Sequence, residues 1–151
     1  MNKLLKISAV ILIVGLVLAV SSCSMFSALG KVFTRVQNGE NPIDDSLTVK
    51  AVLFPVDENN ESIPTTGKPT NIIEQKQVSN MNPGQSVELA FDNAILVGTK
   101  VKLYIGLRTK TTHKYYRSET VIEIQEGINL VDAMPDFEEI SQAEANWWMR
   151  L

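Results

Sequence analysis

The chain has 151 residues, a net charge of −3 and a single cysteine. This length suits one domain whose core needs no cross-links. One cysteine rules out an internal disulfide and a multi-thiolate metal site, and the acidic balance argues against nucleic acid as a partner.

The first 22 residues follow a three-part pattern. Lys3 and Lys6 make a basic start, residues 7–20 are apolar, and Ser21 and Ser22 stand just before Cys23. The apolar run, at about 14 residues, is shorter than the roughly 20 that span a bilayer and fits the apolar region of a secretory signal. A retained N-terminal membrane anchor is the alternative interpretation.

This pattern resembles the lipobox signal peptide of bacterial lipoproteins. The resemblance implies removal of residues 1–22 and attachment of acyl chains, such as palmitate, to Cys23. Removal would leave 129 residues, with 12 basic against 17 acidic side chains, a net charge of −5. We therefore expect a membrane partner, reached through the lipid on Cys23, and a place in the bacterial envelope outside the cytoplasm. Ser24, rather than Asp, follows the cysteine, which in enteric bacteria implies the outer membrane.

Residues 23–46 are predicted to be a lipidated tether. Apolar side chains at Phe26, Leu29, Phe33 and Val36 recur at helical spacing, so part of this segment is expected to be helical. Such a helix could pack on the domain or lie on the membrane beside the lipid.

Residues 47–134 are predicted to form an antiparallel β-sandwich. Strands are expected at 47–54, 72–78, 86–91, 100–110, 116–124 and 128–131, with polar turns at 57–61, 66–69 and 82–85. No segment of helical period lies between these strands, which argues against parallel βαβ units.

The clearest predicted strand is 100–110, followed by a hairpin loop at 111–114. Its alternation places four apolar side chains on the core face: Val101, Leu103, Ile105 and Leu107. The stretch Gly98 to Tyr104, the hairpin, and Glu126 to Val131 together resemble the end of transthyretin-like and immunoglobulin-like modules of bacterial envelope lipoproteins. The resemblance covers residues 84–134. It implies a sandwich that binds or spaces rather than catalyses.

A second resemblance is to the small outer-membrane lipoproteins of type VI secretion systems, which are also sandwiches behind a lipobox. It rests on the turn at Pro83 and Gly84, the strand to Arg108, and the pair Tyr116 and Arg117. The N-terminal half of those proteins has no counterpart in this chain. This resemblance implies an assembly component of a secretion machine.

No motif for catalysis, a metal or a cofactor is found. His113 is the only histidine and falls in the predicted hairpin loop, without a second imidazole or a cysteine for zinc. The acidic stretch 57–61 lacks the glycine and glutamate of a calcium loop, and 66–69 lacks the upstream glycine of a phosphate loop. We therefore expect no cofactor and no enzyme activity, although an envelope enzyme remains the competing class.

A basic face on the predicted hairpin is the candidate binding surface. Its residues are Lys100, Lys102, Tyr104, Arg108, Lys110, Lys114 and Arg117, with Tyr115 among them. On an acidic domain this segregation could attract an anionic lipid headgroup, a glycan or an acidic envelope protein. The alternative is a solvated outer face whose lysines protect a sheet edge.

Residues 135–151 are predicted to form a C-terminal helix or tail. Ser141 and Glu144 have the spacing of a capping box. Trp147 is expected to face the core, in line with Phe137, Ile140 and Leu151. Because adjacent helical side chains diverge by about 100°, Trp148 is then the candidate for docking to a partner or the membrane.

These features predict a lipid-anchored, non-catalytic binding or structural protein of the bacterial envelope. The alternatives are the secretion-machine lipoprotein and, with less support, the envelope enzyme.

Overall fold

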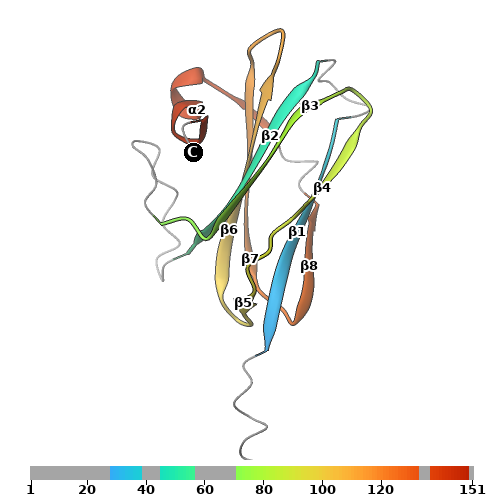
Figure 1. Ribbon diagram of the computed structural model, residues 1–151. Helices are drawn as coiled ribbons and strands as arrows, with labels where there is room; N and C mark the ends of the chain where they lie inside the picture. The colour runs from blue at the N-terminus through green and yellow to red at the C-terminus, as the bar shows by residue number, and fades with distance from the viewer. Residues whose placement is uncertain (1–27, 39–44, 57–70, 133–136, 150–151) are drawn as a thin grey trace, which may run out of the picture.

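A computed structural model describes residues 28–38, 45–56, 71–132 and 137–149. The signal-like segment, Cys23 and the turns predicted at 57–61 and 66–69 lie outside these ranges. The described residues form nine strands and one helix, arranged as two facing sheets with the helix on one outer side (Figure 1). The predicted β-sandwich with a short C-terminal helix is therefore confirmed.

The smaller sheet is built around the first strand. Its four strands are β1 (Leu29–Gln37), β4 (Ser86–Ala90), β5 (Ile95–Leu96) and β8 (Gly127–Asp132). β1 pairs antiparallel with β4 and β5 on one side and parallel with β8 on the other. The parallel pair departs from the expected pattern. It is possible because β2 to β7 separate the two strands in sequence, so no short connection has to join them.

The larger sheet is entirely antiparallel. Its order is β3 (Glu74–Met81), β2 (Leu47–Pro55), β6 (Lys100–Thr109), β7 (Tyr115–Glu123) and β9 (Glu138–Ile140). β2 and β6 pair along their whole lengths, from Leu47 opposite Thr109 to Pro55 opposite Val101. The strands predicted at 47–54, 72–78 and 100–110 and the hairpin loop are confirmed, whereas β9 was not predicted.

The helix expected within residues 23–46 is wrong where the structure describes this segment. Residues 29–37 form β1, in which Val32, Thr34 and Val36 are buried and Lys31 and Arg35 are exposed. The segment carries two periodicities at once, and the β-branched residues at every second position favour a strand. The sandwich therefore starts with β1, before the predicted boundary at residue 47.

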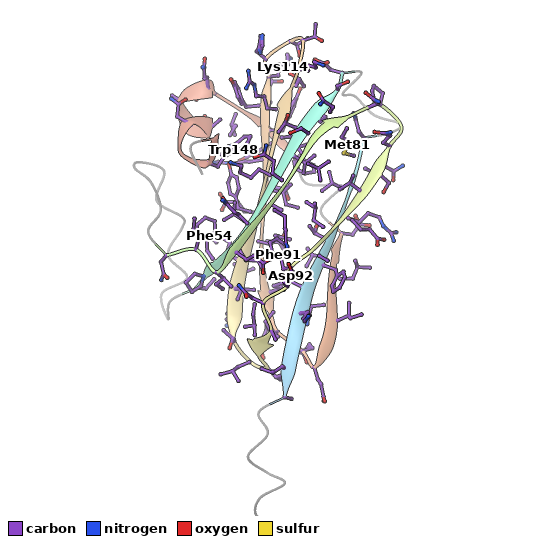
Figure 2. The ribbon with its side chains drawn as sticks, in the orientation of Figure 1. Phe54, Met81, Phe91, Asp92, Lys114 and Trp148 are labelled. Atoms are coloured by element: carbon purple, nitrogen blue, oxygen red, sulfur yellow. The ribbon has the colours of Figure 1, made fainter. Side chains whose placement is uncertain are left out.

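The main core lies between the two sheets. Val101, Leu103, Ile105 and Leu107 are all buried in it, as predicted, and Phe91 fills its middle (Figure 2). Thr34 on β1 is a buried polar residue. Its hydroxyl donates a hydrogen bond to the carbonyl of Val131 on β8 at 2.9 Å. Burial of this interlocked apolar surface is the main source of stability of such a domain.

A second apolar cluster covers the outer face of the larger sheet. Helix α2 (Gln142–Met149) lies over this face, and Trp148 packs on Tyr104 with ring centroids 6.5 Å apart (Figure 2). The cluster comprises Val52, Phe54, Tyr104, Tyr115, Ile140, Ala145 and Trp148. The predicted exposure of Trp148 is wrong, since its residue surface is only 2% exposed. The side chain of Trp147 lies outside the description.

The start of α2 is fixed by the predicted capping box. The Ser141 amide and hydroxyl both donate to the Glu144 carboxylate, at 2.9 and 2.8 Å, and the Glu144 amide donates back to the hydroxyl at 3.3 Å. These bonds lower the pKa of Glu144. The helical stripe proposed from Phe137 onward is wrong, because Ile140 belongs to β9 and the helix begins only after Ser141.

Candidate functional site

Two members of the predicted basic face are buried. Lys102 is only 7% exposed, and Tyr104 is fully buried beneath Trp148, so neither can meet a large partner. The Lys102 ammonium lies 3.6 Å from the carboxylate of Glu119 on β7. Burial raises the pKa of the Tyr104 hydroxyl, which therefore stays protonated. The prediction that these two side chains point to solvent is wrong.

Strand β9 neutralises two more members of the set. Lys114 pairs with Glu139 at 3.1 Å, and Arg117 pairs with Glu138 through a short hydrogen bond from Nε. The bond and charge of Glu138 raise the pKa of Arg117, and Glu139 does the same for Lys114. Exposed pairs of this kind add little to stability. They do offset the positive charge of Lys114 and Arg117. The sequence predicted a positive patch because it did not predict β9.

The other three cations of the set are exposed and lie at the two ends of β6. Lys100 lies at one end, and Arg108 and Lys110 lie at the other, next to the hairpin loop. The Nη2 atom of Arg108 lies 3.4 Å from Nδ1 of His113. His113 is exposed in the hairpin loop, as predicted. The set is therefore divided between opposite ends of the domain.

Asp45 holds the hairpin loop in place. Its carboxylate accepts hydrogen bonds from the amides of Thr111 and Thr112, at 2.8 and 3.0 Å, from the hydroxyls of both, and from the amide of Ser46 at 2.8 Å. Desolvation alone would raise the pKa of Asp45. The hydrogen bonds from Thr112, Thr111 and Ser46 outweigh it and lower the pKa to about 2. Sequence reasoning missed this contact, which joins residues 66 positions apart.

A polar hollow of about 160 Å³ lies beside this loop. It is lined by Ser46, Leu47, Thr48, Asn80, Arg108, Thr109 and Lys110. A guanidinium, an ammonium and several hydroxyls around one hollow suit a carboxylate, sulfate or phosphate group of a ligand. Among the predicted site residues, Arg108 and Lys110 are thus brought together, and Lys100 is not.

The other polar clusters serve the fold. Glu74 accepts the amides of Asp92 and Asn93, at 3.0 and 2.9 Å, and pairs with Lys76 at 2.9 Å. Desolvation raises the pKa of Glu74, but these bonds prevail and lower it, so this carboxylate is not tuned as a general acid. A second hollow, lined by Arg117, Ser118, Glu119 and Glu138, contains the ion pair of β7 with β9. Within the described ranges, no three acidic, histidine or cysteine side chains gather as metal ligands would.

An apolar surface that the sequence reasoning missed lies on the outer face of the smaller sheet. Ile128 is 72% exposed and Leu130 59% exposed on β8, and Leu29 on β1 lies opposite Leu96 on β5, both about half exposed. The neighbouring Val97 is also exposed. We call Leu29, Leu96, Val97, Ile128 and Leu130 the apolar face.

On the inner side of this end of the sheet, the residues are the polar Asn129 and the small Gly30. Asn129 points inward, where its amide donates to the carbonyls of Gln125 and Lys31 at 3.0 and 3.3 Å and accepts from the Gln125 amide at 2.8 Å. A Cβ on Gly30 would overlap the Gln125 carbonyl and the Asn129 side chain. The reversed pattern, with Asn129 between two large apolar residues, was the sequence signal that could have revealed the apolar face.

No helix in the described part of the chain has the length and hydrophobicity to cross a bilayer. Comparisons with protein-family models, with curated proteins and with solved structures gave no match.

Proposed function

We propose that the chain is a lipid-anchored, non-catalytic binding or structural protein of the bacterial cell envelope. The observation that carries the proposal is the sequence around Cys23, where a basic start, a short apolar run and small residues precede the sole cysteine. A thiolate is the side chain that most readily accepts a lipid as a thioether. Two or more acyl chains hold a protein stably on a bilayer.

The layout of the domain supports a role in presenting a binding surface. β1 begins six residues after Cys23, at the lower end of Figure 1, and the β6–β7 hairpin lies at the upper end. A strand of ten residues spans about 33 Å. The hollow with Arg108 and Lys110 would therefore stand away from the membrane and reach an acidic protein or glycan of the envelope.

Acylation is tested in a bacterial host fed with a clickable palmitate analogue. We expect label on the wild type, membrane retention, and a mature N-terminus at Cys23. Cys23→Ala should lose the label and keep residues 1–22. Unlabelled wild type, or a mature chain that begins elsewhere, would contradict the proposal.

Binding at the hollow is tested by photo-crosslinking in cells. A photoreactive residue replaces Lys110 in one strain and Lys100, at the other end of the same strand, in the control strain. We expect a specific adduct from position 110 that Arg108→Ala weakens. Equal adducts from both positions would mean that the hollow has no special role.

A further inference from the structure

The outer face of the smaller sheet changes character along its strands. At the end where β1, β5 and β8 meet, it consists of the apolar face, with Lys31 opposite Ile128. At the far end, Arg35 pairs with Glu88 at 2.6 Å. The apolar part thus reaches the tip of the domain instead of lying in the middle of the sheet.

This tip is also the end from which the chain leads back to Cys23. Leu29 opens β1 and is itself part of the apolar face. Six residues of fully extended chain span at most about 20 Å. If Cys23 is acylated, Leu29 cannot lie farther than that from the lipid attachment point, and the rest of the apolar face lies beside Leu29 on the same sheet.

The anchor also removes most of the cost of docking. A tethered surface meets its target at high effective concentration, so a small contact suffices where free association would need a much larger one. Burying apolar surface yields about 25 cal/mol per Å². A few half-exposed Leu and Ile side chains are then enough to orient the domain.

A bilayer fits this surface better than a second copy of the chain does. An interface between proteins has its apolar part in the middle, with a polar rim around it. Here the apolar part extends to the tip, and Lys31 within it has an aliphatic stem and an ammonium suited to a phosphate headgroup. Glu126 in the exposed turn before β8 limits the contact to headgroup depth.

We propose that the apolar face of Leu29, Leu96, Val97, Ile128 and Leu130 rests directly on the bilayer that holds the acylated Cys23. The occupant is the headgroup region of that same membrane. Docking tilts the domain towards its smaller sheet and leaves the larger sheet, with the β6–β7 hairpin, on the side away from the bilayer (Figure 1). This inference rests on the proposed lipid anchor and adds to it a defined membrane-facing surface.

The test uses the full chain, matured in cells, purified and reconstituted into vesicles of phosphatidylethanolamine and phosphatidylglycerol. Acylation blocks the only native thiol, so a single added cysteine can carry an environment-sensitive dye. Leu96→Cys and Ile128→Cys place the dye on the apolar face, and Thr112→Cys places it in the hairpin loop as the control. We expect blue-shifted emission and quenching by headgroup-level nitroxide lipids at the first two positions only.

Each other outcome overturns the inference in a distinguishable way. If the chain is acylated and floats with the vesicles while all three dyes report water, the anchor stands and the apolar face does not dock. A blue shift at Leu96→Cys and Ile128→Cys without quenching by nitroxide lipids means that protein, a second copy included, covers the face. If the wild type itself takes up dye at Cys23 and does not float, the proposed anchor fails and the inference falls with it.

Discussion

The two outer faces of the sandwich are opposites of what their sequences predict. The outer side of β6 carries polar residues, yet Lys102 and Tyr104 are buried there, and Tyr104 lies beneath Trp148 of α2. The outer side of β8 carries Ile128 and Leu130, yet both are exposed. Alternation along a strand defines two faces, but what covers each face is decided by elements elsewhere in the chain.

The difference has an energetic meaning. The covered face obtains its apolar contacts from within the chain, through Trp148 and the short strand β9. The residues of the apolar face are instead 40–72% exposed, and exposed apolar surface of this kind marks a site of contact with another body. The first face should therefore respond strongly to mutation in the isolated protein, and the second should respond only when a membrane is present.

The largest effect is expected for Trp148→Ala. Removing this ring exposes the second cluster and leaves a cavity over Tyr104, so the free energy of unfolding should fall by about 3–5 kcal/mol. Urea denaturation followed by circular dichroism measures it.

Trp148→Phe is the matched variant. The indole nitrogen of Trp148 is buried without a hydrogen-bond acceptor among the described residues. Phenylalanine therefore loses packing but no hydrogen bond, and it should lower the free energy of unfolding by less than alanine does. Equal, negligible losses for Ala and Phe would show that α2 does not close the face.

A smaller effect is expected for Gly106→Ala. A Cβ at this position would lie 2.6 Å from the Trp148 ring, so the helix must shift outward. Overpacking of this kind costs about 1–3 kcal/mol. In the Trp148→Ala background the added methyl has room, so its cost should largely vanish, and a double-mutant cycle measures the coupling. Additive costs would place the ring elsewhere.

The fold could be predicted because its strongest signals are local. The alternation of Val101, Leu103, Ile105 and Leu107 predicted β6, and the spacing of Ser141 and Glu144 predicted the helix start. β1 was mistaken for a helix because apolar residues at both periods share the segment. Its true partners, β4, β5 and β8, lie far away in the sequence.

The candidate site was harder to predict because charge depends on neighbours that are distant in the chain. Lys114 and Arg117 read as a basic patch until β9 brings Glu139 and Glu138 beside them. The choice between two adjacent tryptophans depended on the helix phase. The supposed helical stripe from Phe137 gave the wrong phase, because Ile140 is in a strand.

Acid should weaken the hydrogen bonds by which Asp45 holds the β6–β7 hairpin loop. The Asp45 carboxyl has a pKa of about 2 in the folded protein against an ordinary value of 3.8, so its contribution to stability is fully present above the ordinary value and is lost as the pH falls toward 2. Asp45→Asn should therefore lower the melting temperature at neutral pH, and the difference from wild type should shrink below about pH 4. A difference that stays constant down to pH 2 would mean that the carboxylate does not hold the loop.

The smallest effect on folding is expected on the apolar face. Ile128→Thr and Leu130→Thr introduce a β-branched residue that suits a strand, and they remove apolar surface that is largely in contact with water. Each should therefore change the free energy of unfolding by no more than about 0.5 kcal/mol. The variant that combines Ile128→Thr and Leu130→Thr, when acylated, should lose the fixed orientation on vesicles, seen as loss of the blue shift from a dye at Leu96→Cys. A large loss of stability without any membrane would instead mean that the chain itself covers this face, and the contrast between the two faces would disappear.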